Sequence, residues 1–173
     1  MSKKGQFYFI AVIILATIFI SFITLSNNIS YTSAPKLSEE QGSINTEIAS
    51  LMDYFSRNQI SSYNQTEIFL NFSKYYINET GLDKNTFFLY GNSSAVILSG
   101  NLVSGTTLSV NTGSGNSPVE NIGIFQKGYL FSGTNNVTLT VDNISYNFTF
   151  YPGENLYYLI RYNDGSQSFV LSG

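Results

Sequence analysis

The sequence contains no cysteine and no histidine. Without cysteine no disulfide framework can form, so redox chemistry does not indicate the cellular compartment. The absence of cysteine also excludes thiolate nucleophiles and, together with the absence of histidine, the usual zinc sites. Without histidine there is no imidazole to act as a general base near neutral pH. These absences remove most of the common routes to catalysis.

Charged residues are also scarce, at 11% of the chain. Asn, Ser, Thr, Tyr and Gly take their place, which predicts a surface that is polar but largely uncharged. After Leu25 six basic residues stand against eleven acidic ones, a net charge of −5. Because this balance repels a phosphate backbone, we expect no nucleic-acid partner.

One long run, Phe7 to Leu25, has neither charge, proline nor glycine (FYFIAVIILATIFISFITL). A helix of nineteen residues is about 28 Å long, which matches the hydrocarbon core of a bilayer. The run is too long for one buried strand and apolar on all sides. It predicts a helix that spans a membrane or is buried among copies of itself, and we call it the apolar segment. The residues expected to make these contacts are Phe7, Tyr8, Phe9, Ile10, Ile14, Ile18 and Phe22.

Residues 1–6 (MSKKGQ) form a basic leader directly before the apolar segment. No basic residue follows the segment until Lys36, so the positive-inside rule places the amino terminus in the cytoplasm and the remainder outside. A plain single-pass anchor explains this pattern. A cleaved secretory signal is an alternative, although its apolar region is usually shorter and the nearest small-residue cut, at Ser33-Ala34, lies well beyond the segment.

The stretch Lys3-Lys4-Gly5-Gln6, followed at once by an apolar helix, resembles the class III signal of archaeal type IV pilin-like proteins. The resemblance implies cleavage between Gly5 and Gln6 by a prepilin peptidase on the cytoplasmic side. The apolar helix would then stay on the mature chain and form the core of a filament. Many pilins of this type carry glutamate at the fifth mature position, where this chain has Ile10.

Residues 26–35 are expected to be a polar linker, and residues 36–85 a helical segment. Ile44, Ile48, Leu51 and Phe55 recur with helical spacing, in a helix expected to begin between residues 38 and 43. A second helix is expected to begin at Asn64, because Asn64-Gln65-Thr66-Glu67 has the form of a capping box. Its apolar face would hold Ile68, Phe72 and Tyr75, broadened by Phe69 and Tyr76, and this aromatic stripe is interpreted as core.

From residue 86 to residue 173 the apolar pattern changes to a period of two, which predicts an antiparallel β domain. Asn111 to Pro118 is expected to be its one long loop. The predicted fold class is therefore α+β: an amino-terminal apolar helix, one or two amphipathic helices, and a β-sheet or β-sandwich head. The eight expected strands cover residues 87–90, 95–98, 107–110, 122–126, 137–141, 144–151, 156–162 and 167–171.

Asparagine in the pattern Asn-X-Ser/Thr is the acceptor for N-linked glycans, and the pattern is frequent on the side of the segment expected to lie outside. A coat of glycans would supply the solubility that the few charges do not. In a chain rich in Asn, Ser and Thr some of these patterns arise by chance. The eight candidates are Asn28, Asn64, Asn71, Asn78, Asn92, Asn136, Asn143 and Asn147.

No arrangement of residues typical of an enzyme was found, since serine lacks a base and no nucleophile elbow is present. Acidic residues after residue 86 fall in loops or turns, with nothing to indicate that two of them face each other. Asp142-Asn143 and Asn163-Asp164-Gly165 could offer oxygen ligands to calcium, but ordinary turn chemistry explains both. We therefore predict no enzymatic activity, no catalytic residues, no cofactor and no metal ion.

The sequence as a whole predicts a structural subunit of a cell-surface filament that resembles type IV pilins. Its partners would be copies of itself, the membrane and a prepilin peptidase, and it would lie in the cell envelope or in an extracellular filament used for adhesion. The alternative is a monomeric extracellular binding module held by a single membrane anchor.

Overall fold

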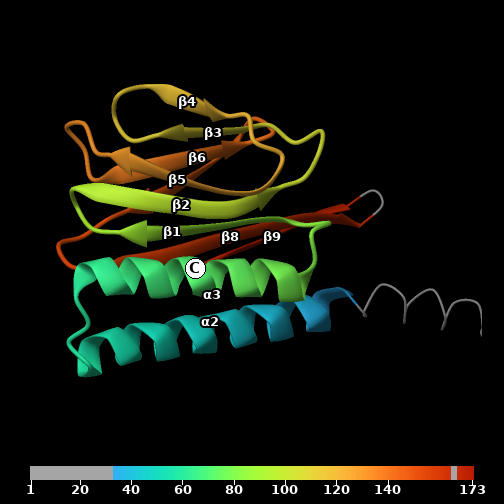
Figure 1. Ribbon diagram of the computed structural model, residues 1–173. Coiled ribbons are helices and arrows are strands. Elements are labelled where there is room, and N and C mark those ends of the chain that lie inside the picture. The colour runs from blue at the N-terminus through green and yellow to red at the C-terminus, as the bar shows by residue number, and fades with distance from the viewer. Residues whose placement is uncertain (1–32, 165–166) are drawn as a thin grey trace, which may run out of the picture. The chain divides into compact units, whose positions relative to one another are not determined.

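The computed structural model describes residues 33–164 and 167–173 (Figure 1). The basic leader, the predicted apolar helix and the candidate Asn28 lie outside these residues. The chain divides into two compact units, Met1–Thr46 and Glu47–Gly173. The second unit contains all nine strands of the described chain.

Helix α2 spans Ser33–Arg57. It therefore begins before the expected range of 38–43, and the last three residues of the expected linker are helical. Pro35 is compatible with this start because it lies in the first turn, where a backbone N–H has no partner within the helix. The predicted apolar stripe is confirmed, since Ile44 and Phe55 are both buried.

Helix α3 spans Ser62–Thr80 and ends before Gly81. Its N-cap is Ser61, so the predicted start at Asn64 is wrong and Asn64 lies within the first turn. The side chain of Gln65 explains the earlier start, because its Nε2 donates to the carbonyl of Ile60 over 2.7 Å. This bond holds the chain before the helix against the first helical turn.

The buried face of α3 differs by about one residue from the predicted one. Tyr75 was expected in this face but is 64% exposed. The centre of the face is instead Ser73. Its hydroxyl forms a hydrogen bond of 2.8 Å with the hydroxyl of Ser99, which lies on the β-sheet against which α3 packs. Because both serines are fully buried, this bond fixes the helix at one position along the sheet. The buried residues of α3 are Phe69, Ser73, Tyr76 and Ile77.

All strand pairs are antiparallel and form two sheets, with orders β5-β2-β1-β8-β9 and β4-β3-β6-β7. The predicted α+β class is confirmed for the described residues, and each of the eight expected strands has a counterpart. The strands are β1 (Asn85–Gly91), β2 (Ala95–Leu102), β3 (Leu108–Asn111), β4 (Asn116–Val119), β5 (Gly123–Leu130), β6 (Asn136–Val141), β7 (Ile144–Thr149), β8 (Asn155–Asp164) and β9 (Gln167–Ser172).

The expected long loop from Asn111 to Pro118 is wrong, because this stretch forms a hairpin between β3 and β4. Asn111 and Asn116 are paired across it. Gly113 and Gly115 have φ angles of 102° and 106°, which glycine adopts readily and which allow the chain to reverse within four residues. Pro118 is tolerated in β4 because this strand lies at the edge of its sheet.

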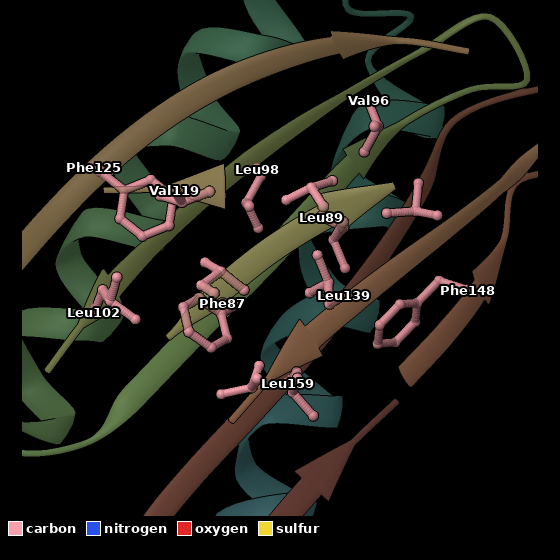
Figure 2. Packing of buried hydrophobic residues seen from close by; sticks show 14 of the residues in the cluster. Phe87, Leu89, Val96, Leu98, Leu102, Val119, Phe125, Leu139, Phe148 and Leu159 are labelled. Atoms are coloured by element: carbon pink, nitrogen blue, oxygen red, sulfur yellow. The ribbon is translucent and has the colours of Figure 1, made fainter. Parts of the chain in front are cut away.

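The two sheets pack face to face through one apolar cluster (Figure 2). Phe87 and Leu89 of β1 enter it from the five-stranded sheet, and Leu139 of β6 and Phe148 of β7 enter it from the four-stranded sheet. Burial of this apolar surface is the main driving force for folding of the second unit.

The opposite face of the five-stranded sheet is covered by α3 (Figure 1). The ring of Phe88 on β1 lies 5.7 Å from the ring of Phe72 and 5.5 Å from that of Tyr76. The ring of Tyr90 stacks on that of Phe69 at 4.9 Å. The aromatic stripe of α3 is therefore core, as predicted, except for Tyr75. β1 is buried along both faces, which explains why its sequence is apolar without alternation.

Candidate functional surfaces

Three of the predicted glycosylation sites form a line along α3. Asn64, Asn71 and Asn78 follow one another at intervals of seven residues, which places them on one side of a helix. All three are exposed, and they lie opposite the buried face that centres on Ser73. The outer side of this helix therefore presents three acceptor asparagines in one row.

Three further sites belong to the other outer layer of this unit, the hairpin of β6 and β7. Asn136 and Asn147 lie on the strands and Asn143 in the turn between them, and all are exposed. Asn147 is already engaged, because its Oδ1 accepts a hydrogen bond of 2.7 Å from Thr138 Oγ1. Asn92 differs from these sites, since it is half-buried in the turn after β1 and its Oδ1 accepts from the backbone N–H of Ser94 at 2.9 Å.

The turn at Asp142-Asn143 is held by contacts with neighbouring protein groups. Both residues have positive φ angles, 47° and 66°, which is typical of a type I′ hairpin turn. The Asp142 carboxylate accepts from the backbone N–H of Thr107 at 2.9 Å and from Nη1 of Arg161 at 2.6 Å. These contacts and φ angles are those of an ordinary hairpin turn. The side chains of the second candidate turn, residues 163–165, lie outside what the structure describes.

Among the described residues Arg161 is the one buried charged residue, and the sequence analysis did not predict it. It lies on β8 of the five-stranded sheet, and its partner Asp142 follows β6 of the four-stranded sheet, so the ion pair joins the two sheets. The Arg161 side chain is 9% exposed and that of Asp142 is 34% exposed. A signal was present in the sequence: Tyr157, Leu159 and Arg161 alternate along β8, so an arginine on the face of Leu159 has to meet a partner.

The ionisable side chains of the described residues include tyrosines with raised pKa values. Within residues 33–164 and 167–173 no three acidic side chains gather as metal ligands would. Burial raises the pKa of Tyr129 to about 12. It also raises the pKa of Tyr90, with a smaller contribution from the nearby charge of Glu154. Because these phenols stay protonated at neutral pH, neither can serve there as a base.

Neither α2 nor α3, the helices of the described part, is long and apolar enough to cross a membrane. Comparisons of the chain with protein-family models, with curated proteins and with solved structures find no match. The resemblance to pilin-like proteins thus rests on the amino-terminal residues alone.

Proposed function

We propose that this protein is the structural subunit of a cell-surface filament that resembles type IV pili. The observation that carries the proposal is the order of the amino-terminal residues: Lys3-Lys4, then Gly5 and Gln6, then nineteen residues without charge. Glycine at the cut lets a protease approach the backbone closely. In the filament the apolar segments of many copies would bundle, with exclusion of water as the driving force, and the β-rich heads would coat the outside.

The head described above supports a structural role. Its two sheets are held by an apolar core and by the buried pair of Arg161 and Asp142, and α3 is held by ring contacts with β1. A compact head of this kind suits a subunit whose work is mechanical. Its outer layers carry exposed acceptor asparagines, and the outer face of the four-stranded sheet is uncharged.

Replacing Gly5 by valine is expected to leave the leader on the chain. A branched side chain at the cut keeps the protease from the backbone, so the protein should retain the mass of residues 1–5 and should not enter filaments. Intact mass of the membrane-extracted protein measures this. Ser2→Ala is the matched control, because it changes the leader but keeps the glycine, and it should be processed like the unchanged protein. Processing of Gly5→Val at the normal position would contradict the proposal.

We further propose that the row on α3 is glycosylated. Native protein analysed by glycopeptide mass spectrometry should carry sugar on Asn64, Asn71 and Asn78, since these acceptors are exposed on one side of a helix. Substituting all three by glutamine should remove this mass. Asn121→Gln is the control, because Asn121 is exposed but is not followed by Ser or Thr at the required position. Unmodified asparagine at all three positions in protein from the native host would contradict the proposal.

The second candidate is the monomeric binding module held by one membrane anchor. It is favoured by the uncharged outer face of the four-stranded sheet, a surface that α3 does not cover (Figure 1).

A further inference from the structure

The solvent-facing side of the four-stranded sheet, which we call the outer sheet face, carries no charged residue. Its alternate positions, among them Val110, Leu139 and Phe148, point into the core. The strand register arranges the outward positions in two rows across all four strands and one shorter row. They are Asn116, Asn111, Thr138 and Asn147; then Pro118, Ser109, Thr140 and Ser145; then Asn136 and Thr149.

Hydrogen bonds between neighbouring strands hold this face in order. Thr138 Oγ1 donates to Asn147 Oδ1 at 2.7 Å, which leaves the Nδ2 donors of Asn147 available. The hydroxyls of Thr140 and Ser145 are 3.0 Å apart. Strands lie about 4.8 Å apart, so the four strands present hydroxyls and amides over a width of about 14 Å. A fixed array of this kind binds at a lower entropic cost than flexible side chains would.

An exposed tyrosine follows β7, just beyond one end of the outer sheet face. Phe150 is fully buried and its backbone N–H donates to the carbonyl of Asn135 at 2.8 Å, so the alternation of β7 continues beyond Thr149. The next outward residue is Tyr151, which is 59% exposed. The Nδ2 of Asn155 donates to the carbonyl of Tyr151 at 2.9 Å and fixes the backbone at Tyr151. A tyrosine ring offers an apolar face beside a polar group, as the ring of a sugar does.

We propose that the outer sheet face binds a neutral polysaccharide that is not attached to the protein. The complementarity is one of charge and hydrogen bonding: uncharged donors and acceptors in rows fit a polymer of uncharged hydroxyl groups. An anionic polymer would find no cation there. A membrane would find neither basic nor large aliphatic side chains. A second protein would find Tyr151 as a single aromatic anchor and no arginine, which is less than a protein interface usually offers. Attached sugar would cover the face, so Asn136 and Asn147 should be unmodified. The inference holds for a filament subunit and for an anchored monomer alike.

The test is affinity electrophoresis of the full chain in detergent, produced in a host without N-glycosylation. The gels contain dextran, mannan, laminarin or galactomannan, with dextran sulfate as the anionic comparison. At least one neutral polymer should retard the protein and dextran sulfate should not. Thr140→Lys places a charge in the centre of the face, and Tyr151→Ala removes the ring without touching the sheet. Each should weaken binding by about tenfold or more. Ser56→Lys, on the exposed side of α2, should leave binding unchanged.

Four results would overturn the inference. The first is the absence of retardation by all four neutral polymers. The second is equal retardation of the unchanged protein, Thr140→Lys and Tyr151→Ala. The third is sugar attached to Asn136 or Asn147 in the native protein. Self-association that Thr140→Lys removes would assign the face to a second copy and would likewise exclude the polysaccharide. Circular dichroism of each variant verifies that the sheet is intact.

Discussion

Cells that produce the Ile18→Asp variant are expected to show no filaments. Ile18 lies near the middle of the apolar segment, where a filament core or a bilayer has no water to solvate a carboxylate. A charge at the centre of a membrane helix costs about 3 kcal/mol on insertion scales. In a bundle of many copies the cost recurs at every subunit, so assembly should fail even where single chains still insert.

Ile18→Leu is the matched control, because it keeps the size and the apolar character of the side chain. Electron microscopy counts the filaments, and carbonate extraction of membranes measures insertion separately. If the protein is only an anchored monomer, Ile18→Asp will chiefly reduce insertion and neither form will produce fibres. Fibres of normal number on cells with the aspartate variant would contradict the filament account.

Asp142→Asn is expected to lower the free energy of unfolding of the head by about 3 kcal/mol, because it leaves Arg161 as a buried charge without its partner. Asparagine adopts positive φ readily, so the turn itself should be unaffected. Arg161→Met should cost clearly less. It removes the more deeply buried charge, while Asp142 keeps access to water through its exposed third.

Urea unfolding followed by circular dichroism measures both variants. Asp53→Asn is the control: Asp53 pairs with Arg57 at 2.8 Å on the surface of α2, where more than half of each side chain is exposed. Such a pair contributes less than about 1 kcal/mol. An Asp142→Asn variant as stable as Asp53→Asn would show that the link between the sheets contributes little. A larger loss in Arg161→Met than in Asp142→Asn would refute the argument from burial.

Much of the strand pattern was readable from alternation alone, since a strand with one buried face repeats its apolar residues every two positions. β4 was missed because its residues, Asn116-Ser117-Pro118-Val119, are nearly all polar or turn-forming. The hydrogen-bond partner that makes them a strand is β3, and only the fold supplies it. The prediction of where α3 begins was wrong for a similar reason. Gln65 also accepts from the hydroxyl of Tyr90, a contact 25 residues away along the chain.

Of the candidate surfaces, one could likewise be predicted from the sequence and one could not. The row of Asn64, Asn71 and Asn78 follows from spacing alone, because seven residues make nearly two turns of a helix. The outer sheet face does not. The alternation within each strand predicts which of its residues are exposed. The strand order β4-β3-β6-β7, however, is what places Ser109 beside Thr140 and joins the polar sides of the strands into one surface. Because such neighbours are far apart along the chain, no local sequence pattern predicts that they lie side by side.

The central claim is that the chain is cut before the apolar segment and keeps this segment. Intact mass combined with amino-terminal sequencing of the native protein tests it most directly. The account predicts a mature chain that begins at Gln6 and retains the apolar segment. A chain that begins at Met1 would contradict processing and leave a simple membrane anchor. A chain that begins beyond Ala34 would contradict both the filament and the anchor.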